Sequence, residues 1–305
     1  MDGHAGHSHG VRSDADRRSL WVALGLLLAF MVGEVVVAFA ADSLALLSDA
    51  GHMLSDVGAI GAALWAMNLA ARPALGRWTF GFKRAEILSA ALNGITLLVV
   101  SGIIAFEAIR RQIDPPATEG TPVLVVALIG IAVNLLATWV LSRTNRSSMN
   151  IEGAYQHILT DLFGFVGTAV AAVVILATGF VRADAIASLL VVVLMIHAAW
   201  GLLRESGAVL LQAAPETTDL EEIRRHLLEE EHVYDVHDLH VWTVTSGLPT
   251  LSVHVVVEDE CFTDGHAPQL LDRLQSCLAG HFDVEHSTFQ LETTGHARHE
   301  HGAHD

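Results

Sequence analysis

The sequence is poor in the residues that nucleic-acid-binding and secreted proteins need. It contains a single lysine, Lys83. Its 17 lysine and arginine residues are outnumbered by 34 acidic residues, which gives a formal net charge of −17. Nucleic-acid binding needs a basic face, so this balance argues against it. The two cysteines, Cys261 and Cys277, are too few for a disulfide framework. We place both in a cytoplasmic segment, where thiols stay reduced.

Charged residues of either sign are also scarce. They make up 17% of the chain, while hydrophobic residues make up 52% and the mean hydropathy is +0.45. The apolar residues come in long blocks, which is typical of a multi-pass membrane protein. A span of about 30 Å of hydrocarbon takes about 20 helical residues, and six stretches are long enough. They are Leu20–Ala41, Leu44–Leu69, Glu86–Ala108, Val123–Leu141, Ser148–Ala177 and Ala183–Leu203.

The basic residues near the span ends predict the orientation. With the N-terminus inside, ten of them are cytoplasmic, and only Arg110, Arg111 and Arg182 lie outside. The positive-inside rule then puts both termini in the cytoplasm of a cell-membrane protein. The polar segment Met1–Ser19 lacks a cleavage-site pattern, so we expect no signal peptide.

The chain outside the spans divides into two tails and one small domain. Residues 1–19 and 294–305 are rich in histidine and are predicted to be disordered cytoplasmic tails. Residues 20–212 form the predicted membrane domain, and 213–293 the predicted cytoplasmic domain. In that domain the pattern predicts a helix, two strands, a helix and a strand, an α+β fold with an open sheet. Its elements are Asp219–Glu231, Val236–Thr245, Leu251–Val257, Pro268–Phe282 and Ser287–Glu292.

Two polar pairs interrupt the apolar spans. His52 and Asp56 lie four residues apart in the second span, and His157 and Asp161 have the same spacing in the fifth. On a helix this spacing puts both side chains on one face. An ionisable residue in hydrocarbon is costly unless it is paired or solvated, so these residues are functional candidates. The other interpretation, a packing network of hydrogen bonds between helices, explains a single histidine better than two matching pairs.

The four side chains suit a divalent metal. Both pairs approach the membrane midplane, where transporters bind their substrates. Two imidazole nitrogens and two carboxylate oxygens are a tetrahedral set for Zn²⁺. Because histidine must be neutral and aspartate ionised to bind metal, protons compete for the same atoms. This competition predicts metal/proton antiport. Asp49, one turn before His52, is a candidate outer-shell residue.

Several motifs resemble the cation diffusion facilitators, in particular their zinc-exporting branch. Residues 43–56, SLALLSDAGHMLSD, resemble the second span of that family, and residues 80–86, FGFKRAE, the entry to its third span. His157–Asp161 resembles the fifth span, and Val236–Trp242, VHDLHVW, the cytoplasmic domain. The resemblance implies a homodimeric six-span exporter with a ferredoxin-like cytoplasmic domain. It also implies that His52, Asp56, His157 and Asp161 are the transport ligands.

The cytoplasmic domain has candidates for a second, regulatory metal site. His237, His254, His266 and Glu292 are plausible ligands there, and the resemblance places metal sites around the three histidines. A surface histidine on a small acidic domain is, however, usually only solvated. The expected cargo is Zn²⁺, with Cd²⁺ and Co²⁺ as further candidates, and no cofactor or enzymatic activity is expected. Two alternatives remain open: a membrane-bound metal sensor and an intramembrane zinc enzyme. Against the enzyme hypothesis, the sequence has no HExxH motif, and four protein ligands leave no open position on the metal for water or substrate.

Overall fold

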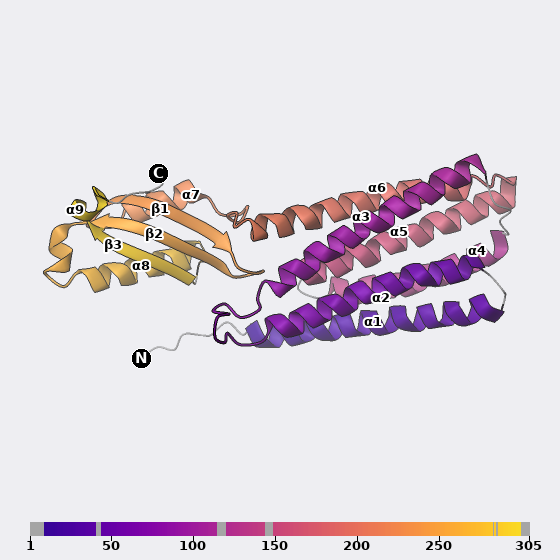
Figure 1. The fold of residues 1–305 in the computed structure, drawn as a ribbon, viewed down its shortest axis with the longest axis horizontal. Coiled ribbons are helices and arrows are strands. Elements are labelled where there is room, and N and C mark those ends of the chain that lie inside the picture. Colours follow the sequence, from indigo (N-terminus) through magenta and orange to yellow (C-terminus); the bar gives the residue numbers. More distant parts are fainter. Residues whose placement is uncertain are drawn as a thin grey trace. The chain divides into compact units, whose positions relative to one another are not determined.

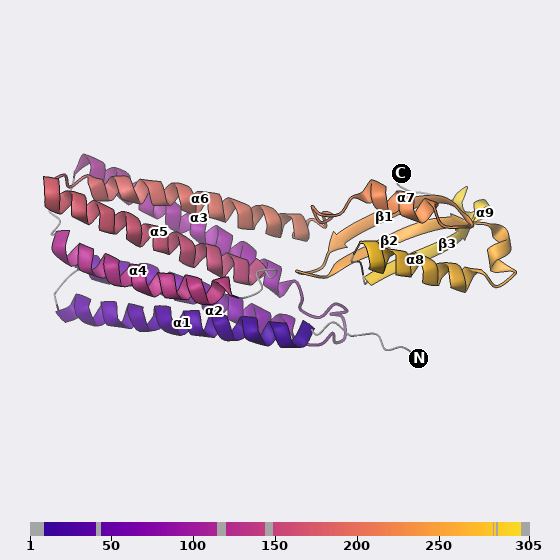
Figure 2. The ribbon, with the colours of Figure 1, turned by 180° about the vertical axis from the view of Figure 1, so that it is seen from behind.

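The computed structural model describes residues 9–40, 44–114, 120–143, 149–282, 284 and 286–299. The chain divides into two compact units, Met1–Ser206 and Gly207–Asp305. Figures 1 and 2 show the first as a set of long helices and the second as a small sheet with short helices.

Among the described residues, the first unit contains six long helices (Figure 1). Five described segments are long and apolar enough to span a membrane, in α1 and α3 to α6. In α2, the apolar stretch of described residues is the shorter Asp56–Ala70. The bounds are α1 His9–Ala40, α2 Leu44–Ala70, α3 Ala85–Ile113, α4 Gly120–Ser142, α5 Met149–Thr178 and α6 Ala183–Leu210.

The outward surface of these helices is apolar. Trp65, Phe106 and Trp200 are each about two-thirds exposed, and many aliphatic side chains of these helices are exposed as well. A soluble protein rarely exposes so much continuous apolar surface, whereas a lipid bilayer solvates it favourably. The first unit is therefore a membrane domain.

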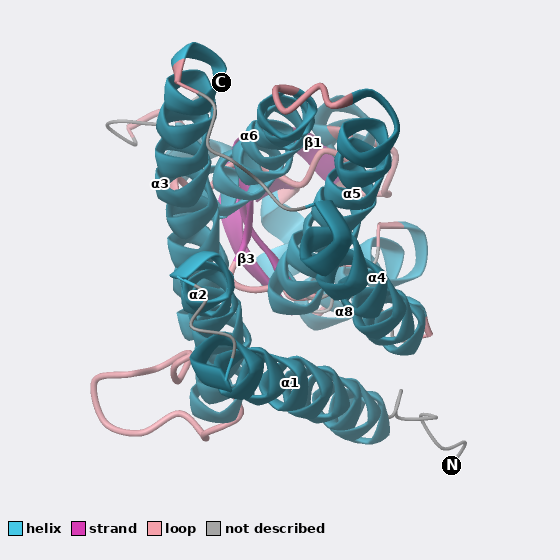
Figure 3. Ribbon diagram, turned by 90° about the vertical axis from the view of Figure 1, so that its right-hand side faces the viewer, coloured by secondary structure: helices cyan, strands magenta, loops and turns pink. Residues whose placement is uncertain are grey.

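Inside the membrane domain, α1, α2, α4 and α5 share one buried cluster. Leu27 of α1, Ile60 of α2, Leu141 of α4 and Ile158 of α5 are among its members, each at most 1% exposed. A second cluster joins α3 to α6 through Leu97 and Ala199. Figure 3 views this domain nearly along the helices and shows α4 beside α5 and α1 beside α2.

A glycine sets the approach of α4 to α5. A Cβ atom at position 130 would overlap the ring of Phe165, closer than real Cβ contacts come. The Phe165 ring also meets Phe30 of α1 edge-on, with 6.0 Å between the ring centroids. The absence of a side chain at position 130 therefore lets the three helices pack around this ring.

The second unit has the predicted order of helix, two strands, helix and strand. Its elements are α7 Leu220–Leu228, β1 Val233–Thr243, β2 Pro249–Val257, η1 Asp259–Phe262, α8 Ala267–His281, β3 His286–Thr293 and α9 Thr294–Ala297. Asp219 caps α7 by accepting hydrogen bonds from the backbone N–H groups of Glu221 and Glu222.

The three strands form one sheet in the order β1-β2-β3. β1 and β2 are antiparallel, whereas β2 and β3 are parallel, which requires the crossover that α8 supplies. Leu251, Val253 and Val255 on β2 are at most 1% exposed and pack with α7 and α8, as the period-2 pattern predicts. The alternate residue His254 therefore belongs to the opposite face, which neither of these helices covers.

Both predicted tails contain helix. α1 begins at His9, well before the predicted span start at Leu20, and residues 1–8 lie outside the described chain. No proline stands between Gly10 and Leu20, so the apolar helix continues through these residues toward the N-terminus. At the other end, Thr293 caps α9, since its hydroxyl accepts a hydrogen bond from the backbone N–H of His296. Residues 300–305 are again outside the description.

Candidate metal centres

The first candidate centre lies between α2 and α5. Asp56 comes from α2, and His157 and Asp161 lie one turn apart on α5. Nε2 of His157 is 2.5 Å from Oδ1 of Asp56 and 3.8 Å from Oδ2 of Asp161. One ligand atom from each of the three lies within 4.8 Å of the others. The structure thus brings together three of the four predicted membrane ligands.

The fourth predicted ligand, His52, and the predicted neighbour Asp49 both belong to α2. This helix runs unbroken from Leu44 to Ala70, so His52 sits one turn before Asp56. The side chains of His52 and Asp49 lie outside the described residues. Their backbone position in α2 agrees with the spacing on which the prediction rests.

The centre is well shielded. The His157 side chain is 5% exposed, that of Asp56 15% and that of Asp161 22%. A small cavity between α2, α3 and α5 borders His157. Most of its lining is small and apolar, and α3 contributes two polar side chains: the full lining is Ala59, Ile60, Ala63, Ser89, Ala90, Asn93, Gly153, Ala154 and His157.

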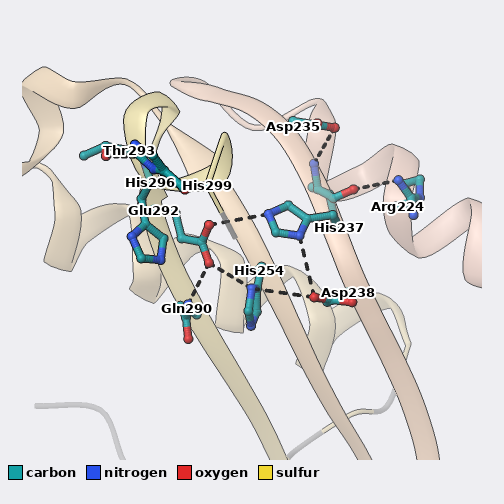
Figure 4. Close-up of polar contacts among 11 residues, drawn as sticks. Arg224, Asp235, His237, Asp238, His254, Gln290, Glu292, Thr293, His296 and His299 are labelled. Carbon is teal, nitrogen blue, oxygen red and sulfur yellow. Dashed lines mark hydrogen bonds and ion pairs between the residues drawn. The ribbon is translucent and has the colours of Figure 1, made fainter. Parts of the chain in front are cut away.

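The second candidate centre is a group of three side chains on the face of the sheet opposite to α7 and α8, here called the strand cluster: His237, His254 and Glu292 (Figure 4). Nδ1 of His254 lies 2.8 Å from Oε1 of Glu292, and Nε2 of His237 lies 3.5 Å from Oε2. The register pairs His237 with His254 directly, and the Glu292 side chain is only 1% exposed. Three strands thus supply one ligand each.

An irregularity in β1 adds a second carboxylate. The register of β1 against β2 shifts between His237 and His240, and Asp238 there has φ +47°. Such a bulge re-aims a side chain. As Figure 4 shows, Asp238 turns toward the cluster, with Oδ2 3.8 Å from Nδ1 of His237 and 4.0 Å from Nδ1 of His254. Gln290 donates a 2.7 Å hydrogen bond to Glu292 and fixes its carboxylate.

His266, the remaining predicted ligand, lies at a different place. It precedes α8, and its ring stacks on that of His232 with 5.8 Å between the centroids. His232 in turn belongs to a group that sequence reasoning missed, with Glu258 and Cys261. No short spacing links His232 to the other two residues, because His232 and Glu258 are 26 positions apart. The signal that could have found them is the antiparallel pairing of the two strands they flank.

The surroundings of this group are acidic. The charge of Glu258, followed by partial burial and Glu260, raises the pKa of Tyr234. Burial, with Asp264 and Glu258 nearby, raises the pKa of the Cys261 thiol. A hydrogen bond with the side chain of His266 lowers the pKa of Asp264. Excess negative charge of this kind favours a bound cation.

Both units match known protein families. Residues 20–211 match the cation efflux transmembrane domain, and residues 215–294 match the cation efflux protein cytoplasmic domain. The second unit is therefore a cytoplasmic domain with a small sheet.

Bacterial relatives resemble the chain over nearly its full length. A cadmium, cobalt and zinc/H(+)-K(+) antiporter of Bacillus subtilis is 38% identical over 293 residues, which cover 95% of this chain and 93% of the relative. The metal cation efflux protein CzcD of Cupriavidus metallidurans is 40% identical over 94% and 90%, respectively. The zinc transporter ZitB of Escherichia coli is 38% identical over 97% and 99%. The chain belongs to the cation efflux family, the cation diffusion facilitators, and is a multi-pass membrane transporter of metal cations and not an enzyme.

Proposed function

We propose that the protein exports divalent metal, foremost Zn²⁺, from the cytoplasm in exchange for protons. The observation that carries this proposal is the meeting of Asp56 with His157 and Asp161 between two membrane helices. The relatives support the choice of ions, because their names specify zinc, cadmium and cobalt, and one names H(+) and K(+) as well. Cd²⁺ and Co²⁺ are therefore further proposed cargoes.

The transport site consists of His52, Asp56, His157 and Asp161. With His52 as the fourth ligand, two nitrogens and two oxygens surround the ion, a closed tetrahedral set that suits Zn²⁺. Asp49 lies one turn further along α2 and acts in the outer shell. Soft thiolate ligands are not part of this set, so the site can release the ion on protonation more readily than a cysteine site can.

Proton coupling follows from the ligand types. Both histidines must be neutral and both aspartates ionised to hold the ion, so each protonation weakens metal binding. When the site faces the cytoplasm, metal displaces protons, and when it faces outward, protons displace metal. The proposed motion separates and rejoins α2 and α5, because each contributes half of the ligands. The small cavity beside His157 brings two polar side chains of α3, Ser89 and Asn93, close to the site.

The topology of the proposal has six spans, with α2 as the sixth. α2 carries half of the site and packs against α1, α3 and α5, so it shares their membrane environment. Both termini are cytoplasmic, because the basic residues near the span ends gather on that side. The protein resides in the cell membrane and acts as a homodimer. The homodimer is supported by the match of residues 215–294 to the family's cytoplasmic domain, whose model is named for dimerisation.

The strand cluster is proposed as a regulatory metal site in a ferredoxin-like domain. His237, His254 and Glu292 form its core, with Asp238 beside them. His266 was predicted as a further ligand but lies beside His232 in this chain. It can join the strand cluster only from another subunit or after movement of the segment before α8.

Flux into proteoliposomes tests the transport proposal. Zinc uptake should rise with an imposed pH gradient and fall when the gradient is collapsed. His157→Ala should abolish uptake, whereas His197→Ala, the matched removal of an exposed α6 histidine, should not. Zinc flux that ignores the gradient would reject antiport. Metal binding without any flux would favour the sensor.

A further inference from the structure

We propose that the cytoplasmic domain has a further site for a soft divalent cation, Zn²⁺ or Cd²⁺, made by His232, Glu258 and Cys261. It shares no residue with the strand cluster or the transport site. His232 and Glu258 flank the same end of the β1–β2 pair, one just before β1 and the other just after β2, and Cys261 lies in η1, which follows β2. This group is here called the thiol cluster.

The strand register brings two of these residues together. Val233 pairs with Val257, so His232 and Glu258 are the adjoining residues just beyond the paired segment. The backbone N–H of Glu258 donates to the carbonyl oxygen of His232 at 3.0 Å. Their side chains also meet, with 2.7 Å between Nδ1 of His232 and Oε2 of Glu258. The pair is therefore fixed by both backbone and side-chain contacts.

Cys261 completes the group from the following turn. The backbone N–H of Cys261 donates to the carbonyl oxygen of Glu258, which folds η1 back onto the pair. One ligand atom from each residue lies within 4.8 Å of the others. In a tetrahedral zinc site, ligand atoms lie about 3.3–3.8 Å apart, as bond lengths of about 2.0–2.3 Å require. Side-chain shifts of about 1 Å would therefore close the group around an ion.

The backbone of His232 has an uncommon conformation. Its φ of +74° lies in the left-handed region, which residues other than glycine seldom adopt. Such a residue at the start of a strand is a reason to look for a function of its side chain. Here the conformation accompanies the contact of the imidazole with Glu258.

His266 supplies a fourth donor. Its ring stacks on that of His232, and its Nδ1 lies 2.7 Å from Oδ2 of Asp264. A carboxylate that holds one ring nitrogen leaves the other free for metal, the arrangement usual for ligating histidines. Two nitrogens, one oxygen and one sulfur suit Zn²⁺ and Cd²⁺, and the thiolate favours them over harder ions such as Mg²⁺.

Cadmium titration of the full-length, detergent-purified protein tests the site. A thiolate bound to Cd²⁺ gives an ultraviolet charge-transfer band, and the chain has only two cysteines. The band should appear in the unmodified protein and in the matched control Cys277→Ser, and it should vanish in Cys261→Ser. It should survive Glu292→Gln, which alters only the strand cluster.

A second pair of variants keeps the test independent of core packing. His232 is only partly buried, so His232→Ala should leave the fold intact and lower the Cd²⁺ affinity at least about tenfold. His240→Ala, which removes an exposed histidine on β1, is the control and should change nothing. A band that persists in Cys261→Ser, or an unaltered affinity in His232→Ala, would overturn the proposal. The titration involves no transport, so its failure would leave the proposed export function standing.

Discussion

Nε2 of His157 lies 2.5 Å from a carboxylate oxygen of Asp56, although 101 positions separate the two residues. The contact joins α5 to α2 within the membrane domain. Oδ2 of Asp161 lies 3.8 Å from the same imidazole nitrogen. A metal ion bound here would replace a hydrogen bond between two helices with bonds to both, so binding and helix contact depend on the same atoms.

The first prediction concerns Asp56. Asp56→Asn keeps the size of the side chain but removes its charge, so Zn²⁺ affinity should fall at least about tenfold in calorimetric titrations. Asp184→Asn is the control, because Asp184, in the first turn of α6, forms an ion pair with Arg111 of α3 and is not one of the proposed ligands. Equal affinities in Asp56→Asn and the unmodified protein would remove Asp56 from the ligand set.

The second prediction concerns Gly130. Gly130→Ala would put a methyl group into the Phe165 ring, and we expect a loss of about 1–3 kcal/mol in unfolding free energy. Gly102→Ala in α3, where a Cβ meets nothing within 4 Å, should be neutral or stabilising. Thermal unfolding in detergent measures both. Adding Phe165→Ala to Gly130→Ala should relieve the clash, so a double variant with purely additive losses would contradict this account.

The third prediction concerns the strand cluster. Zn²⁺ bound there should raise the melting temperature of the cytoplasmic domain within the full-length protein. Glu292→Gln removes the buried carboxylate between the two histidines and should abolish most of this zinc-dependent rise. Glu221→Gln, on the exposed side of α7, should retain it. An unchanged rise in Glu292→Gln would show that zinc stabilises the protein elsewhere.

The fourth prediction concerns the thiols in metal-free protein. Burial raises the pKa of both Cys261 and Cys277, and neighbouring acidic residues raise it further. Only the thiolate reacts with alkylating reagents, and a raised pKa means that it forms only at more alkaline pH. Labelling followed by mass spectrometry should therefore be slow at neutral pH and still increase through the alkaline range. Unfolding in denaturant should make it fast; rapid labelling of the folded protein at pH 7 would contradict the prediction.

What the sequence predicts well is local. The HxxxD spacing depends only on helix geometry, and the alternation of Leu251, Val253 and Val255 only on strand geometry. The structure agrees with the helical spacing and with the burial of these three strand residues. The prediction of a membrane domain followed by a cytoplasmic domain with a small sheet is confirmed. The count of six spans and the ferredoxin-like fold stay predictions.

What it predicts poorly depends on tertiary pairing. His266 shares a domain with His237 and His254, and composition cannot tell which histidines meet. The answer follows from the β1–β2 register and from the path of η1, which place His266 beside His232. The same register assembles His232 with Glu258, a pair for which no periodic spacing exists. The start of α1 at His9 was missed because the polarity of residues 9–19 suggested a tail, although nothing in them breaks a helix.

The division of the membrane centre between α2 and α5 has a thermodynamic consequence. Neither helix alone holds more than two of the proposed ligands. The metal-binding constant therefore depends on the distance between α2 and α5. A conformation that moves them apart by a few ångströms must lose affinity, even where every ligand keeps its charge. Affinity and shape are then linked in both directions: the ion draws the helices together, and any force that separates them expels the ion.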